Sequence, residues 1–106
     1  MGSSGPGERD LLEFSFSNVL FEWRGPSPFH FIAIPQEISD EIKVVAKELS
    51  YGWGVIPVNA AISGVEFTSS LFPKEGSYLL PVKDMVRKKA NINLGDDVQA
   101  TLRLGR

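Results

Sequence analysis

The chain has 106 residues, with 11 Lys and Arg against 13 Asp and Glu, a single His and no Cys. That length suits one domain with one core, and the ordinary composition argues against disordered, collagen-like and coiled-coil proteins. The lack of Cys excludes disulfides and thiolate-bound zinc or iron–sulfur sites, and the net charge of −2 argues against a general polyanion binder.

No segment of the sequence suggests a membrane span or an export signal. The apolar runs fall far short of the roughly 20 residues that a span needs, and no charged start precedes an apolar stretch. We therefore expect a soluble, cytoplasmic protein without a membrane partner. Residues 1–9, which begin with MGSSGPG, are expected to be a flexible N-terminal segment or the remnant of an expression tag.

The first expected element is a strand. From Leu12 to Phe16 apolar and polar residues alternate, a period of two that predicts a half-buried strand. From Val19 to Trp23 the apolar residues fall on the other parity, so we expect a bulge near Asn18 that turns them to the same face. The segment Arg24 to Pro28 has the composition of a turn.

A second strand and a helix follow. Phe29 to Ile34 is apolar at almost every position, which predicts a strand covered on both sides, and Pro35 ends it. Apolar residues then recur at helical spacing, at Ile38, Ile42, Val45 and Leu49. This spacing predicts a helix from about Gln36 or Ser39 to Ser50.

The next segment has the residues of two strands joined by a tight turn. Trp53 to Ile62 is β-rich, although Pro57 must sit at an edge or a bulge because it has no N–H to donate. Ser63-Gly64 is typical of a hairpin turn, and a further strand is expected from Val65 to Phe72. Residues Pro73 to Gly76 then predict a turn.

The last part of the chain repeats this mixture of elements. Tyr78 to Leu80 is expected to be a short strand closed by Pro81, and the apolar spacing from Val82 to Ala90 predicts a short second helix. Asn91 to Asp97 is expected to be a loop, and Val98 to Leu104 alternates as a final strand.

These elements predict a mainly β fold: a small closed or nearly closed six-stranded β-barrel with one or two short α-helices, formed by residues 10–106 as a single domain. Closure would remove exposed strand edges. The segments Ile32 to Pro35 and Tyr78 to Pro81 each lead into a helix, a glycine and a strand. We therefore expect a pseudo-twofold internal repeat.

The sequence offers little for catalysis. His30 is the only imidazole, and it shares strand parity with Ile32, which favours a packed or rim histidine. No nucleophile elbow, zinc-protease helix or phosphate-binding loop motif is present. Asp96-Asp97 follows Gly95 as in a turn that accepts backbone N–H groups. We assign no catalytic residue, metal ligand or cofactor.

One basic cluster suggests a ligand site. Lys83 and Arg87 are four residues apart, so on a helix they would share a face and jointly hold an anion such as a phosphate or a carboxylate. Thr68, Ser69 and Tyr78 would add hydroxyl groups if the barrel brings their strands close. The large aromatic residues are expected in the barrel core, namely Phe21, Trp23, Phe29, Phe31, Trp53, Phe67 and Phe72.

Five segments together resemble one bacterial family: Trp23–Pro35, Gly52–Val58, Thr68–Lys83, Val86–Ala90 and Leu94–Val98. The sequence is similar to DUF1905, a family of domains of unknown function, over nearly the whole expected domain. The resemblance implies a small β-barrel with one or two helices and no established activity. The resemblance further implies a neighbouring domain, since family members often precede a second domain similar to a bacteriocin-protection module associated with an outer-membrane protein.

A looser resemblance concerns the last quarter of the chain. Tyr78 to Leu104 is similar to the strand–Pro–helix–Gly-Asp–strand unit of swapped-hairpin transcription factors that bind DNA as dimers.

Three functions stay open. The first is a non-enzymatic binding or interaction module for a small anionic or polar ligand or a protein partner. The second is nucleic-acid binding through the second helix. The third is an enzyme that uses His30 with a carboxylate and Ser69.

Overall fold

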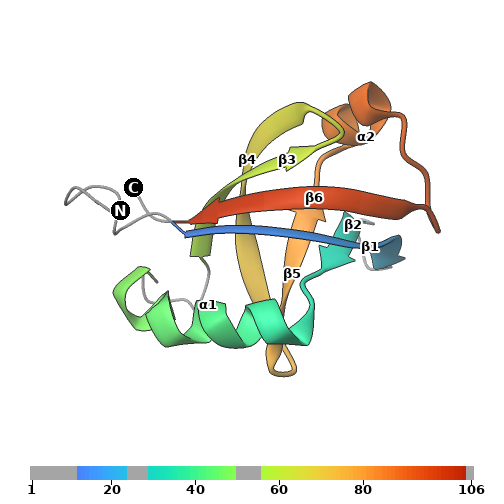
Figure 1. Cartoon of the computed structure of the whole chain (residues 1–106). Helices are drawn as coiled ribbons and strands as arrows, with labels where there is room; N and C mark the ends of the chain where they lie inside the picture. Colours follow the sequence, from blue (N-terminus) through green and yellow to red (C-terminus); the bar gives the residue numbers. More distant parts are fainter. Residues whose placement is uncertain (1–11, 24–28, 50–55, 105–106) are drawn as a thin grey trace.

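The computed structural model describes residues 12–23, 29–49 and 56–104 (Figure 1). In chain order its elements are β1 (Leu12–Trp23), β2 (Phe29–Ala33), α1 (Gln36–Leu49), β3 (Ile56–Ile62), β4 (Val65–Lys74), β5 (Ser77–Val82), α2 (Asp84–Ala90) and β6 (Asp97–Leu104). The predicted flexible segment 1–9, the turn at Arg24 to Pro28 and the residues Ser50 to Trp53 lie outside the described residues.

The six described strands close into a barrel. All neighbours are antiparallel and follow the order β1-β2-β5-β4-β3-β6, and β6 pairs back with β1. The predicted mainly β, six-stranded closed barrel with two helices is therefore confirmed. Helix α1 lies along one side of the barrel and α2 at another (Figure 1). Neither helix has the length and apolar character needed to cross a membrane.

Alternate strand residues and one side of each helix fill the interior. Fully buried aliphatic side chains come from every strand, namely Leu20, Ile32, Ile56, Ile62, Leu71, Leu80, Val98, Leu102 and Leu104. Ile42 of α1 and Val86 of α2 join the same cluster. Each such side chain stabilises the fold by about 1.5–3 kcal/mol relative to exposure. The core therefore spans the whole closed sheet.

Strand β1 keeps one parity throughout, so the predicted bulge near Asn18 is wrong. Leu20 is fully buried, whereas Val19 is 44% exposed. The β1–β6 and β1–β2 ladders both advance without an extra residue. β1 instead changes partner here, from β6 to β2, and the Asn18 side-chain amide donates to the Ala33 carbonyl at 2.9 Å. Phe21 and Trp23 consequently point away from the core.

The expected pseudo-twofold repeat appears in the strand order. The first half is β1-β2-α1-β3 and the second is β4-β5-α2-β6. Exchanging the two halves leaves every pair of neighbouring strands in the closed order unchanged. When the first helical residues, Gln36 and Asp84, are matched, the ladder registers make Leu20 equivalent to Leu71.

This structural match of the two halves differs by two residues from the one that the sequence indicated, in which Pro35 corresponds to Pro81. The ladders allow more than one match of the two halves. The first hydrogen bonds of the helices, from the Ser39 N–H to the Pro35 carbonyl and from the Arg87 N–H to the Lys83 carbonyl, select the one in which Pro35 is equivalent to Lys83, so the two prolines do not correspond. The prolines suggested a match because each lies near the end of its strand. β5 in fact continues past Pro81 to Val82, which the sequence had placed in the second helix.

The turns agree with their sequences, with one shift. Ser63 and Gly64 have φ values of 51° and 81°, as a two-residue hairpin between β3 and β4 requires. The turn after β4 is Glu75-Gly76 alone, with φ values of 49° and 86°. The predicted turn began two residues too early, because Pro73 is still within β4. Pro57 precedes the stretch of β3 that pairs with β6, as its missing N–H requires.

Candidate functional site

Lys83 and Arg87 do not share a helix face. Lys83 precedes α2 with an extended backbone, φ −68° and ψ 151°, and its side chain is exposed. Arg87 lies within α2 with its side chain 22% exposed, and its guanidinium donates to the Asp84 carboxylate at 3.1 Å. Helical spacing does not apply to the pair, because the helix begins one residue after Lys83.

The three predicted hydroxyl residues are dispersed. The Ser69 hydroxyl donates to the Pro81 carbonyl at 3.2 Å, which brings β4 against the segment that leads into Lys83. Thr68 faces the other side of β4 and is exposed. Tyr78 is buried in the core, and burial raises the pKa of its phenol. Of the three, only Ser69 forms a hydrogen bond to the strand segment that leads into Lys83.

A cavity of about 330 Å³ lies between β2, β5 and the start of α2. Its lining residues are Phe29, His30, Pro81, Val82, Lys83 and Asp84. Phe29 and Pro81 give it an apolar wall, and His30 and Lys83 give it nitrogen atoms that can face an anion. His30 lines the cavity with its side chain 13% exposed, where its strand parity had predicted a packed or rim histidine.

Among the described residues, the charged groups around this cavity leave one cation without an ion-pair partner. Asp84 lies between Arg87 at 3.1 Å and the His30 Nδ1 atom at 3.8 Å. Lys83 has no carboxylate within ion-pair distance among the described residues. Glu22 is the β1 residue opposite His30 in the ladder. Arg87 thus offsets Asp84, and among the residues that the structure describes the amine of Lys83 is the cationic group at the cavity without an ion-pair partner.

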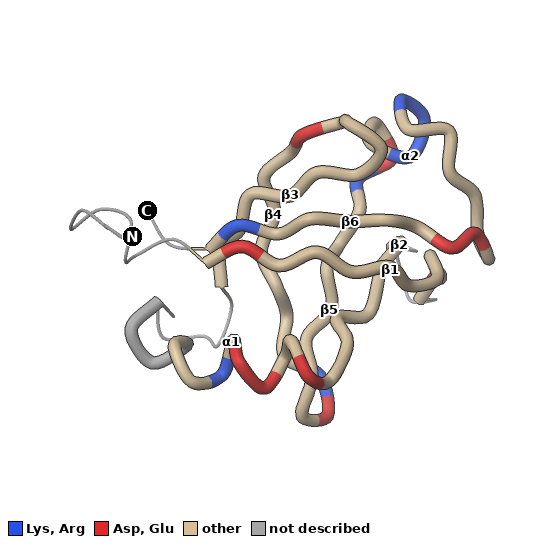
Figure 2. The backbone as a smooth tube through the Cα atoms, viewed as in Figure 1, with Lys and Arg blue, Asp and Glu red and all other residues tan. Residues whose placement is uncertain are grey.

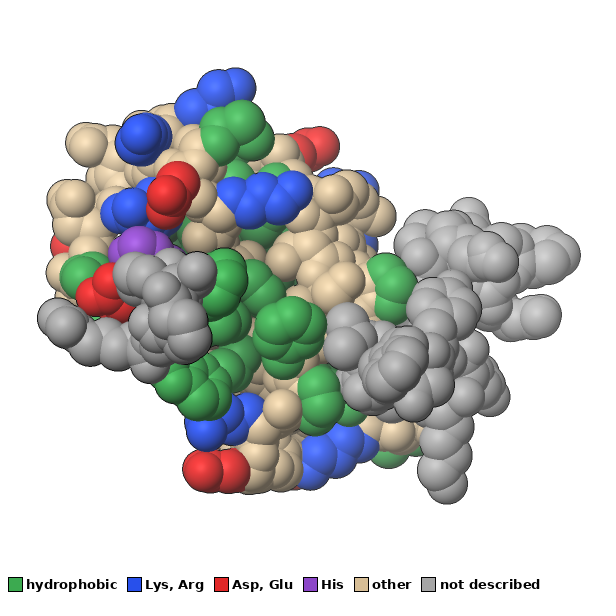
Figure 3. All heavy atoms as spheres, turned by 180° about the vertical axis from the view of Figure 1, so that it is seen from behind, with side chains coloured by type: hydrophobic (Ala, Val, Ile, Leu, Met, Phe, Trp, Pro, Cys, Tyr) green, Lys and Arg blue, Asp and Glu red, His purple; other side chains and the backbone are tan. Residues whose placement is uncertain are grey.

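The outer side of the sheet carries an aromatic surface that the sequence analysis missed. Cross-strand pairing places seven apolar residues on this side of β1, β2, β5 and β4. We call it the aromatic face; it consists of Phe21, Trp23, Phe29, Phe31, Phe72, Leu79 and Pro81. Figure 3 shows hydrophobic side chains gathered at the middle of this side of the molecule, with charged side chains of both signs at their border.

Phe31 is the centre of the aromatic face. It is 5% exposed although it belongs to no part of the barrel's core cluster. Its ring centroid lies 6.0 Å from those of Phe21 and Trp23 and 6.3 Å from that of Phe29. These are distances at which aromatic rings attract one another. The face is therefore a second, smaller apolar cluster outside the barrel.

Most aromatic residues were consequently assigned to the wrong side of the sheet. Phe67 is buried in the core as predicted. Trp23, Phe29 and Phe72 remain 46%, 58% and 44% exposed. Trp53 lies outside the described residues. A sequence signal for the outer position exists in hindsight: a buried Leu directly precedes an outward Phe in both β1 and β4.

Lys74 borders the aromatic face. Its ammonium group lies 4.2 Å from the ring centroid of Trp23, a cation–π contact. The same nitrogen lies 3.6 Å from the Glu75 carboxylate. The charges of Lys74 and Glu75 at this border are therefore already paired with each other.

A second hollow, of about 430 Å³, lies on the outer side of β3, β4 and β6. Asn59, Glu66, Thr68 and Arg103 are among its lining residues. It contains one acidic and one basic side chain, so it has no net charge that would select an anion. Thr68 belongs to this hollow and does not line the cavity beside Lys83.

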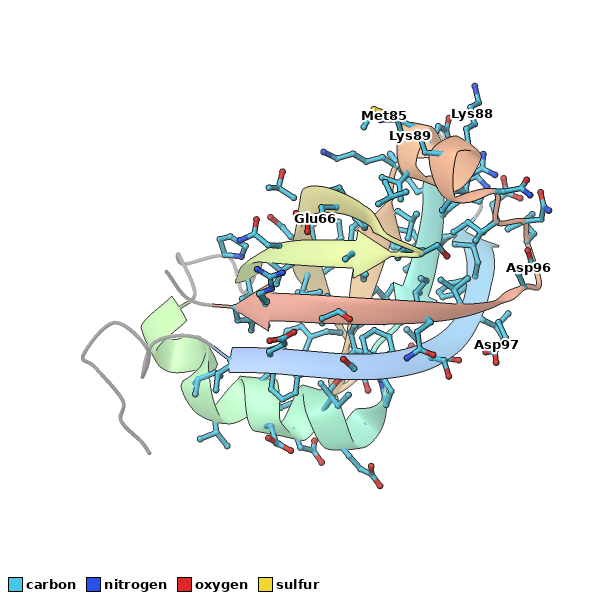
Figure 4. All side chains as sticks on the ribbon, turned by 45° about the horizontal axis from the view of Figure 1, so that its top comes forward. Glu66, Met85, Lys88, Lys89, Asp96 and Asp97 are labelled. Carbon is cyan, nitrogen blue, oxygen red and sulfur yellow. The ribbon has the colours of Figure 1, made fainter. Side chains whose placement is uncertain are left out.

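Asp96, Lys88 and Lys89, which the sequence also singled out, do not line the cavity. The Asp96 carboxylate accepts the Asn93 backbone N–H at 2.8 Å, as expected for a turn. Lys88 and Lys89 project from α2 away from the barrel (Figure 4). Within the described ranges no group of three His, Asp or Glu side chains is close enough to hold a metal ion.

The comparison with known families covers most of the barrel. A family model described as "Domain of unknown function (DUF1905)" matches residues 16–102. The match confirms the resemblance carried by the sequence motifs. No curated protein matches the sequence.

Proposed function

Because the chain belongs to the DUF1905 family, whose description assigns no activity, we propose a function from the site itself. The protein is a non-enzymatic binding module that takes a small ligand with an anionic group in the cavity beside Lys83. The observation that carries this proposal is the uncompensated amine of Lys83 at a cavity that also has an apolar wall.

The cavity suits a carboxylate or phosphate attached to an apolar body. An anionic group would lie between Lys83 and the His30 ring, where charge-assisted hydrogen bonds are stronger than neutral ones. The apolar body would lie against Phe29 and Pro81. A bare inorganic anion would leave that wall exposed to water, so an aromatic acid is the better ligand.

The other predicted site residues have supporting roles or none in this proposal. Arg87 offsets the charge of Asp84, and Ser69 holds the Pro81 carbonyl in place. Thr68 and Tyr78 do not take part, because they line neither wall of the cavity. No catalytic step is assigned, since the Ser69 hydroxyl donates to a backbone carbonyl and not to His30.

A titration with benzoate, phenyl phosphate and inorganic phosphate tests the proposal. We expect backbone amide shifts around His30 and Lys83, with tighter binding of the two aromatic anions. Lys83→Gln should weaken benzoate binding by about fivefold or more, since it removes roughly 1 kcal/mol of charge interaction. The matched control Lys88→Gln, on the solvent side of α2, should leave affinity unchanged. Equal effects of both substitutions, or no amide shifts, would overturn the proposal.

Nucleic-acid binding is the alternative, and the exposed lysines of α2 favour it. Lys83, Lys88 and Lys89 are exposed on or beside one short helix, and Figure 2 shows Lys and Arg at α2. Phosphate contacts of this kind give an affinity that falls steeply with salt. Titration of single- and double-stranded DNA at low and high salt decides the question. DNA binding at low salt that is lost in the double variant Lys88→Gln/Lys89→Gln would support this alternative. The absence of DNA binding at low salt eliminates it.

A further inference from the structure

The cavity beside Lys83 and the aromatic face form one continuous surface, since Phe29 and Pro81 belong to both. From this continuity we propose that the ligand is a segment of a partner protein in which a carboxylate lies next to bulky apolar side chains. The inference rests on the proposed function, because it places the carboxylate at Lys83. It extends that function by placing the apolar side chains on the aromatic face.

The extent of the aromatic face is the first argument. Trp23, Phe29 and Phe72 are each about half exposed, and the rings of Trp23 and Phe29 pack against the buried Phe31. Contiguous apolar surface of this kind on a folded protein usually marks an interaction site. Exposed Trp and Phe side chains are also the residue types that carry much of the binding energy in protein interfaces. A ligand that fits the cavity alone would leave this surface in contact with water.

The rigidity of the aromatic face is the second argument. Its side chains stand on the paired strands of a closed barrel, and they follow the internal repeat. The cross-strand pair Phe21–Phe31 in the first half is equivalent to the pair Phe72–Leu79 in the second. Phe31 is in turn paired with Pro81 across the β2–β5 boundary. A face fixed in this way loses little conformational freedom when a partner binds, which favours affinity.

The charges at the border select the partner. Glu75 is paired with Lys74, and Asp84 is paired with Arg87. Lys83 therefore lacks a carboxylate from its own described surroundings. A second copy of the chain, laid face to face, would bring Glu75 and Asp84, whose charges are already paired. A partner segment with its own carboxylate supplies the missing charge, so charge complementarity favours a different protein over self-association.

The two sources of that carboxylate are an acidic side chain and the end of a chain. Three synthetic probes separate them: acetyl-Phe-Leu-Phe with a free carboxyl end, the same peptide as an amide, and acetyl-Phe-Leu-Phe-Asp amide. Binding to the full chain is measured by amide shifts and by fluorescence in the Trp53→Phe variant, in which Trp23 is the remaining tryptophan. We expect at least one carboxylate-bearing peptide to bind about tenfold or more tightly than the amide, a difference of about 1.4 kcal/mol.

Substitutions then assign each half of the probe to its part of the surface. Phe72→Ala should weaken peptide binding and leave benzoate binding unchanged, because Phe72 is on the aromatic face but does not line the cavity. Lys83→Gln should weaken both. The control is Val44→Ala on α1, where an apolar side chain is 77% exposed and is not part of the aromatic face. Trp23→Ser provides a second test of the face.

The outcomes separate this inference from the proposed function. If benzoate binds at Lys83 but no peptide binds more tightly than benzoate, the partner inference fails and the proposed function stands. If a peptide binds with equal affinity as acid and amide, the carboxylate is not recognised and the inference also fails. If neither benzoate nor peptide binds, both fail. Self-association of the free chain that Phe72→Ala abolishes would assign the aromatic face to a second copy and overturn the partner inference.

Discussion

Asn18 and Ser69 occupy equivalent positions in the two halves of the barrel, and each donates a side-chain hydrogen bond to a neighbouring strand. The amide of Asn18 donates to the Ala33 carbonyl at 2.9 Å, and the hydroxyl of Ser69 donates to the Pro81 carbonyl at 3.2 Å. In both places a long strand passes from one partner to the next. The side chain supplies a hydrogen bond where the backbone ladder does not reach.

These two bonds are expected to contribute similarly to stability. Asn18→Ala and Ser69→Ala each leave a part-buried carbonyl without its donor, at a cost of about 1–2 kcal/mol. In a domain of this size that lowers Tm by roughly 4–8 °C per kcal/mol. Thermal unfolding measures it, with Ser17→Ala on the exposed side of β1 as control. Variants as stable as the control would show that the carbonyls find other donors.

The parity of β1 is tested by two neighbouring substitutions. Leu20→Ala should cost about 2–5 kcal/mol, because it opens a cavity in the core. Val19→Ala should cost less than about 0.5 kcal/mol, since that side chain faces solvent. Chemical denaturation gives both free energies of unfolding. A larger loss of stability in Val19→Ala than in Leu20→Ala would contradict this parity and support a bulge near Asn18.

Stability is expected to fall at alkaline pH because of Tyr78. Its pKa is raised above the ordinary value of 10.0 by burial, so above about pH 10 the unfolded chain releases a proton that the folded chain keeps. The free energy of unfolding therefore decreases as the pH rises through that region. The free energy of unfolding of the Tyr78→Phe variant should decrease less than that of the unsubstituted protein between about pH 9 and about pH 11.

Absorbance provides a second measurement of the same group. In the Tyr51→Phe variant, Tyr78 is the remaining tyrosine, and its phenolate band should appear above the ordinary pKa. Titration at or below that value would contradict the burial effect.

Removing the carboxylate at the cavity should favour anions. Asp84→Asn removes a carboxylate that lines the cavity and frees Arg87, so benzoate affinity should rise by about two- to fivefold. The loss of stability should stay below about 1 kcal/mol, since the carboxylate is largely exposed. Asp97→Asn, at the start of β6, is the control (Figure 4). Weaker binding in Asp84→Asn would mean that the carboxylate helps to hold the ligand.

Local signals in the sequence were sufficient for the number and order of the elements. The Ser63-Gly64 hairpin and the start of α1 at Gln36 depend on neighbouring residues only, and both agree with the structure. Barrel closure followed from short strands separated by frequent turns. The side to which a strand turns its apolar residues is different, because it depends on what covers the sheet from outside.

Strand β1 shows why this information was missing. In this part of β1 the apolar residues Val19, Phe21 and Trp23 outnumber Leu20. If only one face of the strand is assumed to be buried, the alternation therefore assigns these three residues to the core. In the structure, the outward rings of Phe21 and Trp23 instead pack against the Phe31 side chain of the neighbouring strand. The candidate site met a similar limit. The spacing of Lys83 and Arg87 implies a shared face only if both residues are helical, and the helix starts between them.

The pairing of Leu12 with Leu104 joins the first and last residues of the barrel. A short linker could therefore connect the two ends, and the chain could be opened at Ser63-Gly64 instead, to give a circular permutant with the same strand neighbours. It also means that any domain fused to either terminus would be tethered at one common point of the barrel.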